Sequence, residues 1–451
     1  MSAAPDPDLP PVPEAIVLTR PTGVRWLVFS LACGTSWLLY FHRYTFGLVK
    51  PFLVDEWGIS KTELGEVDRV FALCYMVFQV PAGFLADMIG TRFFLAACIS
   101  IWSGALYSQT LVSNTYGLSW SLGILGMSQA GVYPSLSKVS RIWFPISIRT
   151  TVQGWIGVFF GRLGASSTNL ILMSLAVGMM HLPWQKAVQI SAVMGLVLAA
   201  VFLWFFRDTP RTHPRANLAE IELIEGSARI DAPGAAVVER PSLWILIRSR
   251  RGLNLLCLTL QTFLSTMADQ FYVSWLVLFF SDTYEPGAIM LGVVASMPLI
   301  GGAFGGVAGG MLNDRLLKWG VSRRMSRSAV GMTGKGIAGL LIAFGALGLM
   351  NNMYLMCACL VLVKFFSDWS LASTWGTVTD VGGRYSATVF AFNNGLASLA
   401  PFVIARTLGV IADYGWRELL LFVGAIYIAC AFSWLLVNAE RDLFPESTNP
   451  A

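Results

Sequence analysis

The feature that most limits how this chain folds is a succession of apolar stretches, each long enough to cross a lipid bilayer. A membrane-spanning helix needs about 20 mostly apolar residues. Twelve stretches meet this requirement: 24–49, 64–86, 93–112, 116–140, 150–178, 187–206, 252–280, 287–312, 328–350, 352–378, 385–411 and 416–438. Because backbone N–H and C=O groups cannot stay unpaired in hydrocarbon, we predict that each stretch is an α-helix.

Composition excludes several other classes of protein. Hydrophobic residues make up 55% of the chain and charged residues 13%, whereas soluble domains average about 25% charged residues. The seven cysteines lie in apolar stretches without metal-site spacing, so we expect them to be packing residues. The sequence has no basic block typical of nucleic-acid binding, no phosphate-binding Gly-rich run and no zinc pattern. We therefore expect no enzyme, no cofactor, no metal and no nucleic-acid partner.

The polar interval 207–251 divides the twelve stretches into two groups of six. Within it, residues 217–225 predict a short amphipathic helix on the membrane surface. The other predicted parts are a disordered tail (1–20), an N-terminal bundle (21–206), a C-terminal bundle (252–440) and a second tail (441–451). The predicted fold class is an all-α integral membrane protein with twelve transmembrane helices in two pseudo-symmetric six-helix bundles.

The distribution of Lys and Arg predicts the orientation in the membrane, because cytoplasmic loops carry an excess of both residues. One set of loops holds Arg92, Lys138, Arg141, Arg149, Arg315, Lys318, Arg323, Arg324, Arg327 and Arg384. The opposite set holds Lys50, Lys61, Lys186 and Arg417. We expect the first set, both termini and the central interval to be cytoplasmic. The expected location is a bacterial inner membrane, where the chain lies in lipid as a monomer.

Two similar segments, six spans apart, indicate an internal duplication. Gly83-Phe-Leu-Ala-Asp87-Met-Ile-Gly90-Thr-Arg92 follows the second stretch, and Gly310-Met-Leu-Asn-Asp314-Arg315 follows the eighth. In carriers built from repeats, the substrate site lies between the halves near the bilayer midplane. The charged residues of the two segments (Asp87, Arg92, Asp314 and Arg315) are candidate gating residues, which hold the halves in one state and release them in the other.

The segment from Gly83 to Arg92 resembles the loop signature of the major facilitator superfamily, Gly-x-x-x-Asp-x-x-Gly-x-Arg. Within that superfamily, residues 24–440 look most similar to the anion:cation symporters. The similarity is carried by Arg43, Tyr133-Pro134, Trp143-Phe-Pro145, Asp208-Thr-Pro210, His213-Pro214, Asn217-Leu-Ala-Glu-Ile-Glu, Asp380-Val-Gly-Gly-Arg384-Tyr-Ser-Ala-Thr-Val and Asn393-Asn394. The resemblance, together with Arg43, implies a carrier that moves a small organic monoanion, such as a sugar acid or other carboxylate, together with protons by alternating access.

The chain departs from the symporter pattern in its fourth stretch. The family carries an Arg and, seven residues later, a Glu that binds the coupled proton; the matching residues here are Leu122 and Gln129. Arg43 also matches an Arg of the organophosphate antiporters, but Asp269 stands near their second Arg, so a phosphate ester is not expected. A proton-independent facilitator or exporter, a membrane sensor of similar shape and a lipid-handling carrier are the alternatives to a symporter.

Several ionisable residues lie inside the predicted spans, where a charge at the bilayer centre costs about 2.5–3.5 kcal/mol. Arg43 and Asp269 occupy similar positions in the first and seventh stretches. We expect them to face a shared cavity and to pair when the cavity is empty. An incoming anion would displace Asp269 from Arg43, and Asp269 would then accept a proton. The alternatives are a static structural ion pair and an Asp269 that only faces water.

Other polar residues complete the candidate site. Lys364 and Asp368 are four residues apart and share one face of the tenth stretch. Either they compensate each other, or Lys364 binds the anion and Asp368 the proton. Arg162, in the fifth stretch, either binds substrate or holds neighbouring carbonyls. Uncharged candidates for the substrate pocket are Tyr40, Gln129, Tyr133, Tyr272, Asn393 and Asn394. His42 is a residue type that titrates near neutral pH, but it points about 100° away from Arg43 around a helix.

Overall fold

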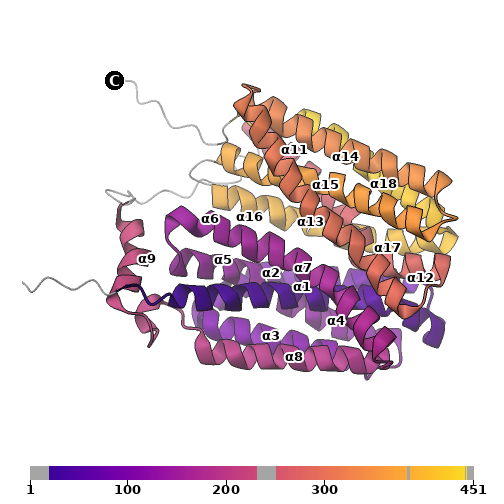
Figure 1. The fold of residues 1–451 in the computed structure, drawn as a ribbon, viewed down its shortest axis with the longest axis horizontal. Helices are drawn as coiled ribbons and strands as arrows, with labels where there is room; N and C mark the ends of the chain where they lie inside the picture. Colours follow the sequence, from indigo (N-terminus) through magenta and orange to yellow (C-terminus); the bar gives the residue numbers. More distant parts are fainter. Residues whose placement is uncertain (1–19, 231–249, 383–385, 442, 444–451) are drawn as a thin grey trace, which may run out of the picture.

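The structure, a computed structural model, describes residues 20–230, 250–382, 386–441 and 443. The predicted tails at 1–20 and 441–451 fall almost wholly outside the described residues, and Arg384 also lies outside them. The described residues form helices joined by short connections, with no β-strand among them (Figure 1). The prediction of an all-helical fold is confirmed.

The first half of the chain forms one bundle, coloured indigo to magenta in Figure 1. Its α-helices are α1 (Val24–Trp57), α2 (Lys61–Ile89), α3 (Thr91–Ser108), α4 (Thr115–Gln129), α5 (Val132–Trp143), α6 (Ile146–Gly154), α7 (Phe160–Thr168) and α8 (Trp184–Phe205). Two π-helical segments, η1 (Trp155–Phe159) and η2 (Asn169–Met179), flank α7. η1 joins α6 to α7 and η2 follows α7, so the four segments form one long run. π-helical turns are rare and occur frequently at functional sites.

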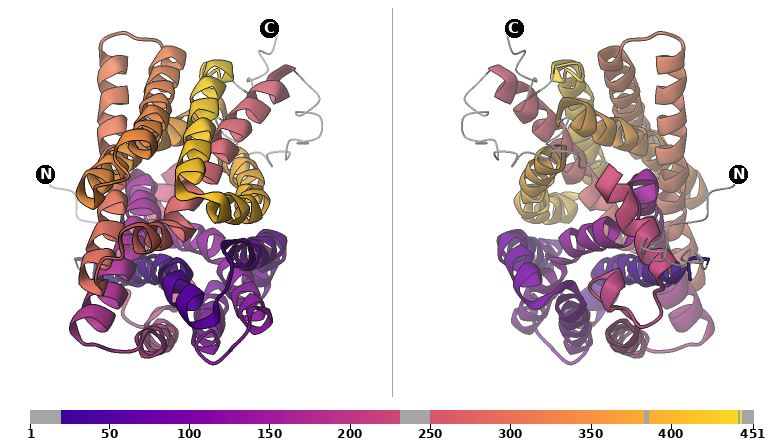
Figure 2. Two further views of the ribbon diagram at one scale, coloured as in Figure 1. Left: turned by 90° about the vertical axis from the view of Figure 1, so that its right-hand side faces the viewer. Right: turned by 90° about the vertical axis from the view of Figure 1, so that its left-hand side faces the viewer.

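The second half forms the other bundle, coloured orange to yellow, which lies above the first in Figure 2. Its elements are α11 (Arg250–Ser274), α12 (Leu276–Tyr284), α13 (Ala288–Lys318), α14 (Arg323–Gly348), α15 (Met353–Gly382), α16 (Ser386–Ala397), α17 (Leu399–Tyr414), α18 (Trp416–Ser433) and the 3-10 turn η5 (Trp434–Leu436).

The described elements follow the twelve predicted stretches in order. Eight helices or helix runs are long and apolar enough to cross a membrane, and ten are if each of two bent pairs counts as one span. One pair is α2, which bends by 52° at Pro81, where proline removes a backbone donor. The other is α11 with α12, which bends by 51°. The two remaining stretches are α3 and the broken helix α4–α5.

The connection between the halves is anchored to the first bundle. It contains the 3-10 turn η3 (Pro210–Thr212) and α9 (Leu218–Ile230), which confirms the helix predicted around 217–225. The buried Glu220 carboxylate of α9 accepts hydrogen bonds from the backbone N–H groups of Gly23 (3.0 Å) and Arg25 (3.2 Å). Glu220 thus satisfies donors at the start of α1 that have no partner within that helix.

The first helix is longer than the sequence predicted. α1 continues through Pro51 to Trp57, so Lys50, which we had placed in a loop, lies inside the helix and is fully buried. The loop assignment is wrong because Lys50 has a partner that the pattern did not reveal. Its Nζ donates to Asp68 Oδ2 over 2.6 Å, and Asp68 also accepts from Ser274 Oγ at 2.7 Å. A buried ion pair therefore links α1, α2 and the end of α11.

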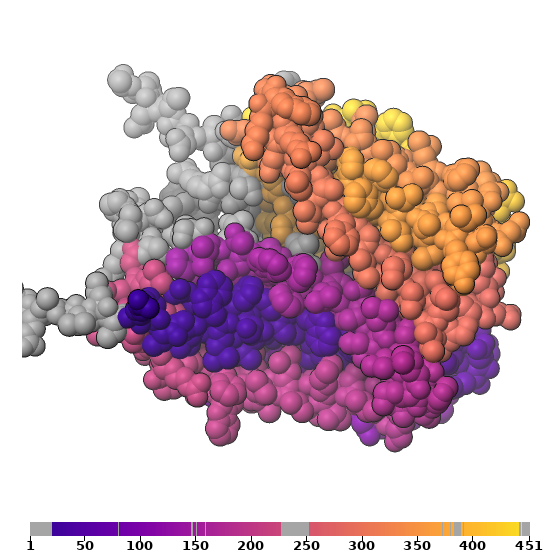
Figure 3. Space-filling view, in the orientation of Figure 1, coloured from indigo at the N-terminus to yellow at the C-terminus, as the bar shows by residue number. Residues whose placement is uncertain are grey.

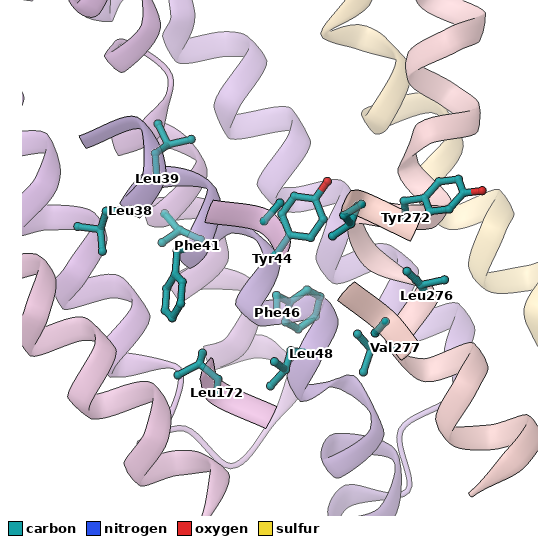
Figure 4. Packing of buried hydrophobic residues seen from close by; sticks show 14 of the residues in the cluster. Leu38, Leu39, Phe41, Tyr44, Phe46, Leu48, Leu172, Tyr272, Leu276 and Val277 are labelled. Carbon is teal, nitrogen blue, oxygen red and sulfur yellow. The ribbon is translucent and has the colours of Figure 1, made fainter. Parts of the chain in front are cut away.

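The two bundles are joined mainly at the end opposite the termini, which we call the far end (Figure 3). A Cβ at Gly47 would lie 2.7 Å from the carbonyl oxygen of Val273, and one at Gly65 would lie 2.7 Å from that of Ala405. Buried apolar side chains continue the α1–α12 contact, among them Phe46 and Leu276 (Figure 4). These close backbone approaches, with no room for a side chain, seal the far end.

Polar contacts between the bundles also begin at the far end. The backbone N–H groups of Lys61 and Thr62 donate to Asp413 at 3.0 and 2.9 Å, and Arg406 pairs with Glu66 at 3.0 Å. Along α2 this series extends to a 3.4 Å hydrogen bond from Gln79 to Ser398. Two residues later α2 bends at Pro81, and beyond the bend Asp87 bonds to Lys138 of its own bundle. The bundles are thus held together from the far end rather than from the end that carries the termini.

Within the second bundle, α13 packs against α15 through glycines. A Cβ at Gly305 would collide with the backbone of Phe365, and one at Gly309 with that of Trp369. Small residues that let two backbones approach closely are the usual basis of helix association in lipid. At Gly306, by contrast, the nearest atom to an added Cβ is the Asp368 carbonyl oxygen at 3.9 Å.

Gly305→Ala and Gly306→Ala form a matched test of this packing. Gly305→Ala forces α13 away from α15, so we expect a loss of about 1–3 kcal/mol in stability. Gly306→Ala should be neutral or slightly stabilising, because alanine is the better helix former. The melting temperatures of the purified variants, measured in detergent, give the comparison. Equal melting temperatures would contradict the close approach of α13 and α15.

Candidate functional site

Four charged side chains meet near the middle of the membrane-spanning region. Lys364 Nζ donates to Asp269 Oδ1 at 2.9 Å and to Asp368 Oδ1 at 2.7 Å. Arg162 Nη2 lies 2.8 Å from Asp368 Oδ2. Lys364 is fully buried and Asp368 is 3% exposed, while Asp269 and Arg162 are 27% and 21% exposed. Two cations and two carboxylates therefore compensate one another, with the outer members facing more open space.

Local sequence explains why these four groups can meet. Lys364 and Asp368 are one helical turn apart on α15, so their side chains lie on one face. Gly302 of α13 leaves the space that the Asp368 carboxylate fills, since a Cβ there would lie 2.5 Å from Oδ2. Arg162 comes from α7, between the two π-helical segments of the first bundle. The ion pair of Arg162 with Asp368 therefore crosses between the bundles.

The predicted pairing of Arg43 with Asp269 is wrong. Asp269 pairs with Lys364 and also accepts a hydrogen bond from Tyr427 Oη at 3.1 Å. The physical reason is the burial of Lys364 beside α11. Leaving this fully buried ammonium without a carboxylate would cost more free energy than leaving Arg43 without one. The sequence placed Lys364 with Asp368 only, whereas the structure shows that it serves both acids.

Arg43 lies instead in a largely uncharged pocket of the first bundle. Its Nε donates to Gln129 Oε1 at 3.0 Å. Its Cζ lies 5.4, 5.6 and 4.7 Å from the ring centroids of Tyr40, Phe71 and Tyr75. Its Nη2 is buried and has no hydrogen-bond partner. A guanidinium held by an amide and aromatic faces keeps its charge and part of its donor fork available for an anion.

The predicted tyrosines line the region around these charges. The Tyr40 and Tyr133 rings lie 6.1 Å apart, and Tyr133 Oη shares a 2.9 Å hydrogen bond with Ser36. Tyr272 places its ring centroid 5.3 Å from Lys364 Nζ, and its buried hydroxyl has no hydrogen-bond partner. The unused donor of Tyr272, beside the paired charges, suits a ligand rich in oxygen.

The remaining polar candidates lie elsewhere or serve other contacts. Asn393 exchanges hydrogen bonds with Thr262 at 3.0 and 3.3 Å, while Asn394 is exposed and is not brought to the charged cluster. His42 Nδ1 accepts from Trp102 Nε1 at 3.0 Å, and its Nε2 lies 3.0 Å from the Ser191 carbonyl oxygen. Both imidazole nitrogens are thus used in packing, which fixes the neutral tautomer.

The predicted gating residues make contacts within their own bundles. Asp87 pairs with Lys138 at 2.7 Å, and Arg92 donates through Nε to the Leu203 carbonyl at the end of α8 at 2.9 Å. Asp314 and Arg315 are exposed. In the second bundle, Arg327 pairs with Asp380 at 3.2 Å. A gating role for the four predicted residues is not tested by these contacts and stays a prediction.

One buried charge escaped the sequence analysis. Lys335 of α14 is fully buried, and its Nζ donates to Ser265 Oγ at 2.7 Å. Its Nζ also lies 5.1 Å from the ring centroid of Tyr427. The signal was present, since Lys335 stands inside the apolar stretch 328–350 between two glycines.

Asp368→Asn and Asp269→Asn test the charged cluster. Asp368→Asn leaves buried Lys364 with one carboxylate and Arg162 with none, so we expect a loss of about 3–5 kcal/mol. Asp269→Asn should cost less, because Lys364 keeps its 2.7 Å bond to Asp368. Thermal melting of the two purified variants ranks them. The reverse order would show that Asp269, and not Asp368, holds the cluster together.

Comparisons with known proteins agree with this architecture. Residues 32–336 match the Major Facilitator Superfamily. The crystal structure of a bacterial homologue of the human lysosomal transporter Spinster, inward-facing and unoccupied, superposes with a TM-score of 0.71 at 15% identity. That match covers 91% of this chain and 98% of the other, and it shows the shared fold.

Two relatives share more of the sequence. The protein named "Probable sulfoacetate transporter SauU" of Cupriavidus necator is 25% identical over 389 residues, which cover 86% of this chain and 87% of that one. The "Hexuronate transporter" of Escherichia coli strain K12 is 28% identical over 396 residues, which cover 87% and 88%. The superfamily match takes in nearly all of the first bundle and the second bundle as far as α14, which is more than half of the chain, and the chain belongs to the Major Facilitator Superfamily of transporters.

Proposed function

We propose that this protein is a secondary transporter for a small organic anion, a sugar acid or another carboxylate, which it moves by alternating access. The observation that carries the proposal is the environment of Arg43. It is a guanidinium inside the membrane with a neutral hydrogen-bond partner, three aromatic neighbours and one buried donor nitrogen without a partner. Such a group gains most from an anion that accepts its forked donors.

The relatives support this substrate class. Their names give a sulfonated carboxylic acid in one case and sugar acids with one carboxylate in the other. Both kinds of ligand combine an acid group with a compact skeleton. The tyrosine hydroxyls near Arg43 and Lys364 are suited to the hydroxyl groups of a sugar acid.

The distribution of contacts supports a state open toward the end that carries the termini. Lys50–Asp68–Ser274 and the glycine contacts hold the bundles together at the far end. The Lys/Arg excess of the loops on the terminus side supports a cytoplasmic position for that side by the positive-inside rule. We therefore propose an inward-open carrier in a bacterial inner membrane, with cytoplasmic termini and a monomeric transport unit.

We propose that Asp269, with Asp368 behind it, couples transport to protons. Asp269 is the more exposed of the two carboxylates and shares Lys364 with Asp368. A proton on Asp269 would leave Lys364 bonded to Asp368 alone and would loosen the link between α11 and α15. The second candidate function is a proton-independent facilitator, which is favoured by Gln129 at the position of the family's glutamate and by the pairing of both acids.

Arg43→Met should strongly weaken substrate binding and so reduce substrate exchange. Loss of a charge-assisted hydrogen bond costs about 1.5–3 kcal/mol, so we expect at least a tenfold loss of affinity. Counterflow of labelled hexuronate in proteoliposomes measures the exchange by each variant. Arg211→Gln is the control, since Arg211 is 62% exposed and pairs with Glu225. Arg43→Lys should be intermediate because it keeps the charge without the fork. Binding without counterflow in the wild type would indicate a sensor.

Asp269→Asn tests proton coupling separately. In the wild type, an imposed pH gradient should accelerate uptake into proteoliposomes. The variant should lose this acceleration and keep counterflow, because exchange needs no net proton movement. If the rate of uptake by the wild type does not depend on the pH gradient, the result favours the facilitator. If uptake by Asp269→Asn is still accelerated by the gradient, Asp269 is not the residue that couples transport to protons.

A further inference from the structure

Lys335 is a buried cation that has no carboxylate bonded to it. Its Nζ has three N–H donors, and the hydrogen bond that it makes within the described residues goes to Ser265 Oγ at 2.7 Å. Its other close neighbour is the face of Tyr427. Lys50 and Lys364, the other two fully buried lysines among the described residues, both form ion pairs. Lys335 therefore differs from them in its lack of an anionic partner.

The charge balance of the central region leaves two cations in excess. Arg162 and Lys364 are matched by Asp269 and Asp368. Arg43 and Lys335 form hydrogen bonds with neutral groups, and the Asp269 carboxylate, which acts on Lys335 electrostatically, is already bonded to Lys364. Arg43 belongs to the first bundle and Lys335 to the second, so each bundle contributes one unmatched positive charge. An unpaired buried charge is costly, and an anion that supplies two charges would relieve both.

Ser265 connects Lys335 to the space between the bundles. Thr262, Ser265, Asp269 and Tyr272 follow one another at three- and four-residue spacing and share one face of α11. Ser265 and Asp269 are both partly exposed on this face. The Ser265 hydroxyl accepts from Lys335, which leaves its own O–H free to donate to a ligand oxygen. A ligand can thus touch Ser265 while the charge of Lys335 acts from behind it.

We propose that Ser265, backed by Lys335, is a second anion-binding point, and that the preferred substrate is a dianion with an acid group at each end. One acid group binds Arg43 of the first bundle, and the other accepts a hydrogen bond from the Ser265 hydroxyl of the second bundle. The inference rests on the proposed function and narrows its substrate class. A monoanion of the same skeleton satisfies Arg43 and leaves Lys335 only the electrostatic interaction with Asp269, whose carboxylate is bonded to Lys364.

Galactarate and galactonate provide a matched pair of probes, since they share a six-carbon skeleton and differ by one carboxylate. Isothermal titration of the purified full-length wild type should give at least tenfold tighter binding of galactarate. In Lys335→Met this preference should fall to about one, with the galactonate affinity changed by less than about twofold. Ser265→Ala should lose part of the preference, and Thr266→Ala, whose hydroxyl bonds to the Thr262 carbonyl of its own helix, should lose none.

Thermal melting without ligand separates a binding role from a structural one. Lys335→Met removes an unmatched buried charge, so its melting temperature should equal or exceed that of the wild type. If Lys335→Met fails to fold, the preference for galactarate over galactonate is measured in Ser265→Ala and Lys335→Gln instead. A lower melting temperature with equal losses for both acids would make Lys335 a structural residue and overturn the proposal.

The proposed function and this inference fail in different ways. If the wild type binds both acids equally and Arg43→Met abolishes both, the anion carrier stands and the second binding point is refuted. If the wild type binds neither these acids nor hexuronate, the proposed function fails and the inference fails with it. A preference for galactarate that survives in Lys335→Met also refutes the role of Lys335.

Discussion

The structure depends on how buried charges are shared in a medium that cannot solvate them. Lys364 bonds to both Asp269 and Asp368, and Arg162 reaches Asp368 from the other bundle. Lys364 and Asp368 each have two partners of opposite charge, so the loss of either one affects two neighbours and the four residues behave as a unit. Because the unit spans both bundles, a change in its protonation or occupancy also changes how strongly the bundles are held together. This gives a physical route from binding to movement.

The seal at the far end uses different chemistry. It combines direct backbone packing at Gly47 and Gly65 with the buried Lys50–Asp68 pair and its Ser274 partner. Opening this end requires Asp68 to leave Ser274, while Lys50 and Asp68 stay together on the first bundle. The pair therefore need not break as the bundles separate, and neither charge has to be exposed to lipid alone.

Sequence reasoning reached the helices, their order and the duplicated halves, because the requirement for about 20 apolar residues per span is strict. It also identified most of the central charges. It predicted the wrong ion-pair partner for Asp269. Arg43 and Asp269 occupy similar positions in the sequence, but Lys364 is the cation that lies beside Asp269. It placed Lys50 in a loop because the ion pair that permits its burial comes from another helix. Lys335 was missed although its position inside the apolar stretch 328–350 marked it, because no charged residue at helical spacing pointed to a partner.

The fixed tautomer of His42 has a consequence for how work is divided between the two bundles. Its imidazole bonds on both sides, and α3 to α8 contain no aspartate or glutamate. The acids of the central region, Asp269 and Asp368, both belong to the second bundle. In the transport cycle proposed above, the first bundle would therefore bind the ligand through Arg43, and hydrogen-ion exchange would fall to Asp269 and Asp368 of the second bundle. Two bundles of similar architecture would then have separate chemical roles in that cycle.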